Sequence, residues 1–149
     1  MRSTYDYEHI VTFDETNLVG NVYFTNHLRW QGHCRELFLQ EHAPNLCVQL
    51  GESLVLVTTR CSCEYYAELA AFDRVLVRMS LGAVRQNRLL LSFEYLRSTD
   101  AGVELVARGE QEVACLERDG SGLHPTPVPA ELGDALRPYQ VDSLRQRLA

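Results

Sequence analysis

The sequence predicts an α+β fold in which a long antiparallel β-sheet wraps around one central α-helix. Three observations support this class: one long segment with helical periodicity, several strand-length segments rich in β-forming residues, and turn signals between those strands. The chain has 149 residues, of which 46% are hydrophobic, so it is long enough for one ordinary core. We therefore predict a single domain over residues 1–149, with a Pro-rich C-terminal tail from about residue 123.

The first two elements are a strand and the helix. Tyr5–Phe13 concentrates β-forming residues in a short run and predicts the first strand. A polar loop with one glycine follows, and the helix is expected from about Phe24 to His42. It should end there because Pro44 lacks the backbone N–H that would continue it.

Four more strands are predicted after the helix, at about Leu54–Tyr66, Arg74–Val84, Leu89–Arg97 and Glu104–Glu117. Turn signals such as Gln86-Asn87 separate them, and their short connections favour an antiparallel meander. The Pro-rich tail is expected to hold a short helix at Ala130–Leu136. One strand, one long helix and four long antiparallel strands is the element order of the hot-dog fold.

Composition and charge narrow the function classes. The formal net charge is −6, and all 14 basic residues are Arg. We exclude nucleic-acid binding because no basic stripe is present to neutralise phosphates. No apolar run is long enough to span a membrane, and the N-terminal segment Met1–Glu8 has no apolar signal core. We therefore expect a cytoplasmic protein without a membrane segment.

The chain has five cysteines, namely Cys34, Cys47, Cys61, Cys63 and Cys115. The number is odd and lacks the spacing of a small disulfide-linked domain, so we expect buried, reduced thiols. Cys61 and Cys63 alternate along a predicted strand and would share a face. Since no further ligands accompany them, we predict no metal site and no cofactor.

The segment from Phe13 to Trp30 is the most informative part of the sequence. Its polar loop leads into the helix start, where unpaired backbone N–H groups and the positive end of the helix dipole favour an oxyanion. Asn17 lies beside this helix start and can hold a water. Gly20 either lets the loop turn tightly into the helix or is an ordinary loop glycine.

This segment resembles the active-site segment of hot-dog acyl thioesterases of the 4-hydroxybenzoyl-CoA thioesterase branch. That segment reads approximately Asp-x-Asp-x-x-Gly-x-Val-x-(Tyr/Phe) and leads into an aromatic-rich helix. Asn17 stands here at the position of the family's catalytic Asp. The stretch Arg60–Asp73 and Asp119-Gly120 with Pro127 also resemble the family pattern, so the resemblance covers residues 5–130. It implies the hot-dog fold, thioester hydrolysis and an active site between two subunits.

Three polar residues fall within the apolar face of the helix when it is drawn at about 100° per residue: His27, Gln31 and Arg35. A buried guanidinium needs partners because it stays charged at pH 7. Arg35 lies about 16 Å along the axis from the helix start, so direct contact with an oxyanion there would have to cross a subunit interface. It either borders the acyl-binding site or forms a structural ion pair with a carboxylate such as Asp14, Glu15 or Glu64.

No family acid is present. A second branch of hot-dog thioesterases carries its catalytic Glu or Asp on the helix, where this chain has Gln31-Gly32-His33, and Glu36 falls on the solvated face. A general base contributes about 10²–10⁴-fold, and an amide cannot accept a proton near neutral pH. Such a site suits a substrate that is already activated, such as a β-ketoacyl thioester.

An Asn in the loop with an Arg on the helix resembles the thioesterases that accompany iterative polyketide synthases of enediyne pathways. The resemblance implies release of a linear polyene from an acyl carrier protein domain, as a β-keto acid or the methyl ketone formed after decarboxylation. Asn17 would position water or the carbonyl oxygen, the Phe24 N–H would be the oxyanion donor, and Arg35 would be the helix arginine. A homo-oligomer, either a dimer or a dimer of dimers, is also implied.

Gly20, His27 and Gln31 complete the expected site as substrate-binding residues. His27 replaces a common Tyr of the family, and either a hydrogen-bonded, partly buried imidazole or a substrate contact would explain it. Hot-dog dehydratases also carry a His on this helix, but the surrounding motif does not match theirs. Two other functions remain open: a general acyl-CoA or aroyl-CoA thioesterase, and a non-catalytic hot-dog module that binds an acyl chain.

Overall fold

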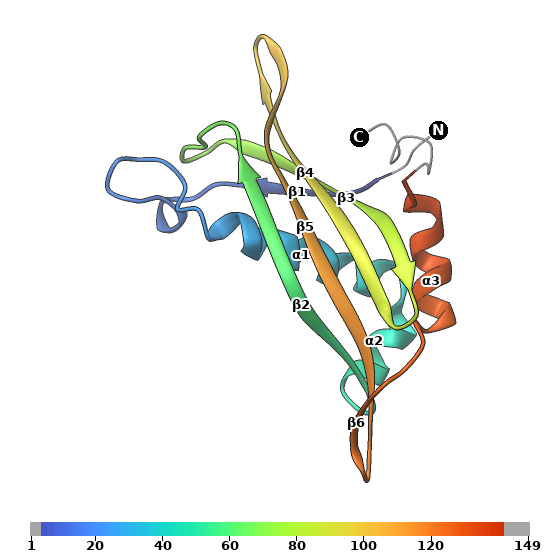
Figure 1. The fold of residues 1–149 in the computed structure, drawn as a ribbon. Helices are drawn as coiled ribbons and strands as arrows, with labels where there is room; N and C mark the ends of the chain where they lie inside the picture. The colour runs from blue at the N-terminus through green and yellow to red at the C-terminus, as the bar shows by residue number, and fades with distance from the viewer. Residues whose placement is uncertain (1–3, 142–149) are drawn as a thin grey trace.

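A computed structural model describes residues 4–141, so Met1–Ser3 of the N-terminal segment lie outside it. The strands of the described chain form one antiparallel sheet in the order β1-β3-β4-β5-β2, with β6 added to β5 (Figure 1). They are β1 (Tyr5–Ile10), β2 (Leu54–Tyr65), β3 (Arg74–Arg85), β4 (Arg88–Thr99), β5 (Gly102–Asp119) and β6 (Gly122–Pro125). The helices are α1 (Asn26–His42), α2 (Pro44–Leu50) and α3 (Ala130–Leu136), and η1 (Phe13–Glu15) and η2 (Arg137–Tyr139) are 3₁₀ turns.

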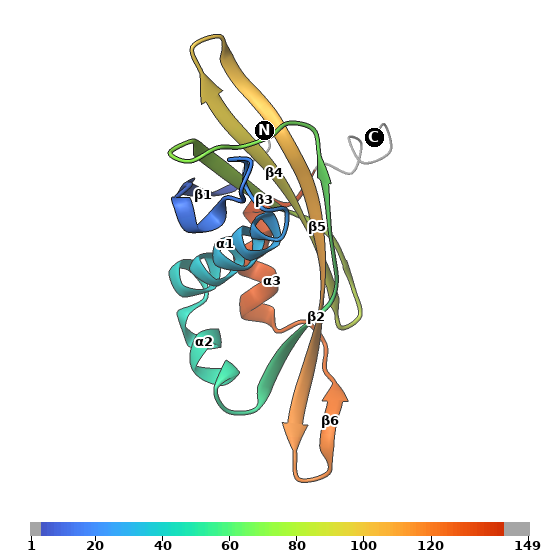
Figure 2. The same cartoon turned by 90° about the vertical axis from the view of Figure 1, so that its left-hand side faces the viewer.

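The sheet curves around α1, as Figure 2 shows from the side. The inner face of α1 buries Trp30, Cys34 and Phe38. Alternate residues of β3 and β4 point at this face, because side chains alternate between the two faces of a strand. The predicted α+β hot-dog fold, with its sheet wrapped around a central helix, is confirmed.

The predicted meander is wrong for β2. This strand pairs with β5 at the far edge of the sheet, so that β3, β4 and β5 alone follow one another. The connection over residues 66–73 crosses the end of the sheet. Eight extended residues span up to about 27 Å, while three strand spacings need only about 14 Å. A short connection therefore did not require adjacent strands.

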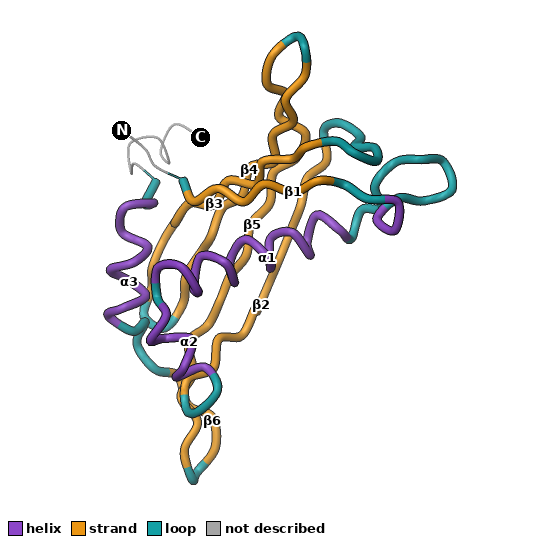
Figure 3. Tube along the Cα trace, turned by 180° about the vertical axis from the view of Figure 1, so that it is seen from behind, coloured by secondary structure: helices purple, strands orange, loops and turns teal. Residues whose placement is uncertain are grey.

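Several element boundaries also differ from the expectation. The first strand ends at Ile10, and α1 begins at Asn26 rather than near Phe24. Pro44 ends α1 but also starts α2, because proline suits the first position of a helix. The tail is part of the domain rather than an extension from it. It forms β6 and then α3, both drawn in Figure 3. Leu132 and Leu136 of α3 are buried in the core.

Candidate active site

The loop between η1 and α1 is a small hairpin closed by backbone contacts. Thr16 and Val22 form an isolated bridge, and Asn17 N–H donates to the Asn21 carbonyl at 2.9 Å. Gly20 turns the loop at φ +94°, a left-handed conformation that strains other residues. This supports the tight-turn interpretation of Gly20. The hairpin lies beside the connection from β2 to β3, as Figure 3 shows, and Val22 N–H donates to the Leu69 carbonyl.

The side chain of Asn17 is oriented by its own loop. Its Oδ1 accepts a hydrogen bond from Val19 N–H at 3.0 Å, as in an Asx turn. The remaining polar atom, Nδ2, donates to none of the residues that the structure describes. Asn17 is exposed and therefore offers a hydrogen-bond donor, not a base.

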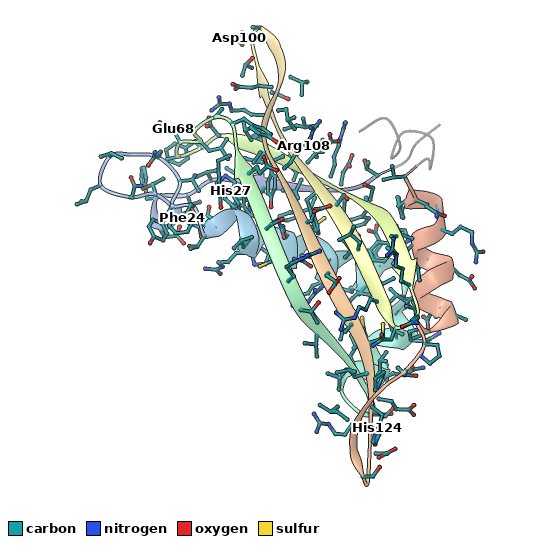
Figure 4. All side chains as sticks on the ribbon, viewed as in Figure 1. Phe24, His27, Glu68, Asp100, Arg108 and His124 are labelled. Carbon is teal, nitrogen blue, oxygen red and sulfur yellow. The ribbon has the colours of Figure 1, made fainter. Side chains whose placement is uncertain are left out.

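Phe24 lies in the turn immediately before α1. Its carbonyl accepts a hydrogen bond from the Tyr65 hydroxyl at 2.7 Å, which ties the turn to β2. Its N–H donates to no acceptor within residues 4–141. Because α1 has 17 residues, this free donor also lies at the positive end of a substantial helix dipole. The arrangement fits the predicted oxyanion donor, and Figure 4 shows Phe24 at this end of α1.

Glu15 is a carboxylate that the sequence analysis left out of the site. It accepts hydrogen bonds from Trp30 Nε1 at 2.9 Å and from Thr12 N–H at 3.0 Å. It also pairs with His9 Nε2 at 2.8 Å. Burial opposes ionisation, but the His9, Trp30 and Thr12 bonds outweigh it and lower the pKa of Glu15. A carboxylate engaged in this way anchors the loop and is a poor general base. The Thr12-x-x-Glu15 capping pattern was the sequence signal for it.

His27 is only 3% exposed, and neither ring nitrogen has a hydrogen-bond partner among the described residues. Its ring packs edge-on against Tyr65 and tilted against Trp30, with centroids 4.7 and 5.0 Å away. Burial lowers the pKa of His27 to about 4; the nearby Phe24 backbone opposes this shift without forming a well-aligned hydrogen bond. The imidazole is therefore neutral at pH 7. The expectation of a hydrogen-bonded histidine is wrong, because its surroundings are aromatic rings.

Gln31 is fully buried one helical turn beyond His27. Its Nε2 donates to the Ser62 carbonyl of β2 at 3.1 Å, while its Oε1 has no partner among the described residues. Gly109 of β5 makes room for this contact, because an added Cβ there would lie 2.1 Å from Gln31 Nε2. Both His27 and Gln31 thus carry buried polar atoms that have no hydrogen-bond partner within residues 4–141.

Arg35 is held by neutral partners. Its Nη1 donates to Thr58 Oγ1 at 2.8 Å and to Gln111 Oε1 at 3.0 Å. Burial lowers the pKa of Arg35 from its ordinary value, but a guanidinium stays charged at neutral pH. No carboxylate of the described chain forms an ion pair with it, so the alternative of a structural ion pair is wrong for Asp14, Glu15 and Glu64.

The site residues fall into two groups within one chain. Asn17, Phe24 and His27 lie at the N-terminal end of α1, whereas Gln31 and Arg35 follow at successive turns toward β2 and β5. Arg35 is nine residues beyond Asn26, about 14 Å along the axis. The fold therefore does not bring Arg35 to the Phe24 N–H of the same chain.

The cysteines are free, but the expectation that all are buried is wrong. Cys34 and Cys115 are buried, whereas Cys47 and Cys61 are exposed and Cys63 is partly buried. Cys61 and Cys63 do share a face, yet β2 is an edge strand and leaves Cys61 open.

Residues 4–141 contain no cluster of three or more His, Cys, Asp or Glu side chains suited to a metal ion. None of the described helices is long and apolar enough to cross a membrane.

Exposed apolar side chains surround the loop end of the molecule. Leu18 and Val19 at the hairpin tip are almost fully exposed, and Phe24 is 55% exposed. Phe13 and Phe72 stack edge to face at 5.1 Å but remain largely open to solvent. Large exposed apolar side chains at one end of a molecule are typical of an interaction surface.

A hot-dog sheet with a free backbone donor at the start of its central helix suits an enzyme that acts on a thioester carbonyl. Residues 11–136 match the family model of the thioesterase-like superfamily, and the chain belongs to that family. No curated protein sequence matches it.

Solved structures support the same family. The dynemicin thioesterase, described with induced-fit and allosteric effects upon polyene binding, is 51% identical with a TM-score of 0.90, over 95% of this chain and 100% of that one. A thioesterase superfamily protein from Jannaschia sp. CCS1 is 28% identical with a TM-score of 0.73, over 85% and 76%. The 4-hydroxybenzoyl CoA thioesterase from Pseudomonas sp. strain CBS-3, at 18% identity and a TM-score of 0.76 over 89% and 98%, shares the fold. The protein is therefore an enzyme that hydrolyses thioesters.

Proposed function

We propose that this thioesterase hydrolyses a β-ketoacyl polyene thioester carried by the acyl carrier protein domain of an iterative polyketide synthase of an enediyne pathway. The product is a β-keto acid, which can lose CO₂ to give a methyl ketone. The observation that carries the proposal is the 51% identity to the dynemicin thioesterase over 95% of the chain. The site supports it, because Asn17 and the Phe24 N–H are donors suited to a carbonyl oxygen and neither of them is a base.

Hydrolysis requires water to add to the thioester carbonyl carbon and the C–S bond to break, with a proton passing from the water to the departing thiolate. We assign the carbonyl oxygen to the free Phe24 N–H at the start of α1. Asn17 Nδ2 is the second donor, because the Val19 N–H already occupies its Oδ1. Two donors that strengthen as negative charge develops would lower the barrier without a proton transfer to the protein.

The lack of a free carboxylate explains why the substrate should be activated. Glu15 is engaged by His9, Thr12 and Trp30 and has a lowered pKa, so it does not replace the missing acid. A β-keto group withdraws electrons from the thioester carbonyl and makes attack by water easier. This favours a β-ketoacyl thioester over a saturated one.

We assign binding of the substrate's acyl chain to the space between α1 and the sheet. A small gap of about 10 Å³ lies there between Arg35, Phe38 and α3, lined otherwise by apolar side chains. His27 and Gln31 supply polar contacts along the same side of α1. An apolar acyl chain must widen this gap to enter. Arg35 borders this gap in its own chain, so we assign it to the acyl-binding site. Contact between an Arg35 and a carbonyl oxygen held at the Phe24 N–H would have to come from a partner subunit.

The test compares a β-ketoacyl pantetheine thioester with its saturated counterpart, using mass spectrometry to detect released acid or methyl ketone. The wild type should prefer the β-keto substrate. Asn17→Ala should lower turnover about 10²-fold, the usual cost of removing one oxyanion contact. Arg35→Ala should also lower turnover, because it removes the charged group that lines the acyl gap. Gln40→Ala, on the exposed side of α1, is the matched control and should behave as the wild type.

A general acyl-CoA or aroyl-CoA thioesterase is the second candidate, because the fold is shared with the 4-hydroxybenzoyl CoA enzyme. Equal turnover of the two substrates by the wild type would favour it. Normal turnover by both site variants would overturn the residue assignment. Family membership argues against the non-catalytic module, which would retain the acyl group on its carrier.

A further inference from the structure

A second hollow lies on the outer face of the sheet, opposite α1. It is a cleft of about 270 Å³. Its charged lining comes from four adjacent strands, with Arg60 on β2, Glu112 on β5, Arg88 on β4 and Arg85 on β3. This outer face is turned to the viewer in Figures 1 and 4, with α1 behind it.

Two irregularities in the sheet flank the cleft. Arg60, Glu112, Leu90 and Ala83 form one row across β2, β5, β4 and β3. The register shifts between Thr58 and Arg60 on β2, and again between Leu81 and Ala83 on β3. Extra residues of this kind bend a strand and redirect its side chains. Both register shifts occur next to this row of residues, at the position of the cleft and of its arginines.

The cleft carries an excess of positive charge. Arg88 pairs with Glu112 at 2.6 Å, and Thr59 Oγ1 also donates to Glu112 at 2.7 Å. Arg60 and Arg85 form no ion pair with any carboxylate of residues 4–141. The three arginines of the cleft still outnumber its acids when Glu110, the next outward carboxylate along β5, is counted together with Glu112. Such a patch is notable in a chain whose net charge is −6.

We propose that this cleft docks an acidic protein surface, namely that of the carrier domain that presents the acyl thioester. The inference rests on the proposed function. Because the chain is negatively charged overall, it repels an acidic partner in most orientations. A local positive cleft would therefore favour binding of that partner in the one orientation that faces the cleft.

The spread of the arginines favours a protein surface over one phosphate. Arg60 and Arg85 lie on strands three spacings apart, about 14 Å across the sheet, so their guanidinium groups suit several spaced anions better than one. Carboxylates on one face of a helix recur about 5–6 Å apart, and several of them can span this distance.

The test reverses two charges with Arg60→Glu/Arg85→Glu. The matched control is Arg74→Glu/Arg137→Glu, at two exposed arginines outside the cleft, with the same change of net charge. One acyl group is presented in three forms, on pantetheine, on coenzyme A and on the carrier domain. We expect the cleft variant to lose about tenfold or more in kcat/KM on the carrier substrate alone, through KM. The control and the two small substrates should change less than about twofold.

Binding of the carrier domain to each variant, measured by fluorescence anisotropy at low and high salt, gives a readout without catalysis. The wild-type Kd should rise with salt, and the cleft variant should bind about tenfold more weakly at low salt. Equal carrier affinity of wild type and cleft variant would overturn the proposal. An equal loss on the coenzyme A substrate would assign the cleft to a phosphate, and a changed sedimentation mass would assign it to a second copy of the chain. If no substrate form is hydrolysed while the carrier still binds at the cleft, the proposed function fails and the docking surface stands.

Discussion

Asn17 and the Phe24 N–H are both hydrogen-bond donors, and neither can take a proton from water. The orientation of Asn17 follows from one contact, since Val19 N–H occupies its oxygen. An Asp in this position would keep an oxygen free as a base. Because Asn17 cannot act as a base, the proposed site favours a substrate whose carbonyl is already activated. His27, close to Phe24, adds a neutral imidazole without hydrogen-bond partners in the described chain.

His27 should make stability depend on pH. Its pKa is lowered from 6.5 to about 4 by burial, so between these values the unfolded chain binds more protons than the folded one. Stability is therefore fully present above pH 6.5 and is lost as pH falls toward 4. Between pH 7 and pH 5 the wild type should lose about 2 kcal/mol that His27→Phe does not lose. Urea unfolding at both pH values measures the difference, and parallel losses in the two proteins would contradict it.

At the scale of elements, α1 and the β2–β5 pair are joined by polar contacts from the buried side of the helix. Gln31 bonds to Ser62, and Arg35 bonds to Thr58 and Gln111. These contacts require a close approach of α1 to β5, which the absence of a side chain at Gly109 permits.

Gly109→Ala should therefore be destabilising. The new Cβ would lie 2.1 Å from Gln31 Nε2 and 2.7 Å from the Ser62 carbonyl oxygen, and the backbone of a paired strand cannot easily move away. We expect a loss of about 1–3 kcal/mol in the free energy of unfolding, as for other overpacked interiors. Gly120→Ala, which meets nothing within 4 Å, should change little and serves as the control. Equal stability of the two variants by denaturant titration would show that α1 tolerates a shift.

At the scale of the whole molecule, one end of the chain is unusually apolar. The hairpin tip, Phe24 and the Phe13–Phe72 pair expose a cluster that a single copy leaves in water. Arg35 is also remote from the loop of its own chain. Both features fit a site completed by a second copy, which the family resemblance implies.

We therefore predict a homo-oligomer of at least twice 17.0 kDa by sedimentation analysis. Leu18→Asp/Val19→Asp should weaken association about tenfold or more and lower turnover with it, because charges are costly within an apolar contact. Val48→Asp/Val103→Asp, at exposed valines elsewhere, is the matched control. A wild type that sediments as a monomer at micromolar concentration would contradict the prediction.

Much of this architecture was predictable from local pattern. Helical periodicity located α1 to within two residues at its start, and α3 was predicted with its bounds, because capping, proline and periodicity act over short distances. The place of β2 was not predictable, since strand order depends on contacts between distant segments. The β6 strand was missed because its four residues include a Gly and a Pro, which are disfavoured within strands.

The sequence by itself determined the family, the loop with Asn17 in place of an acid, and the polar row on the buried face of α1. These follow from residue identity and spacing. Only the tertiary structure decided that Arg35 donates to Thr58 and Gln111 instead of pairing with a carboxylate. It also decided that Glu15 is bonded to His9 and Trp30, and that His27 has no hydrogen-bond partner within residues 4–141. Partners of a buried polar group come from other strands and helices, and their distances are set by packing, which spacing along one chain does not specify.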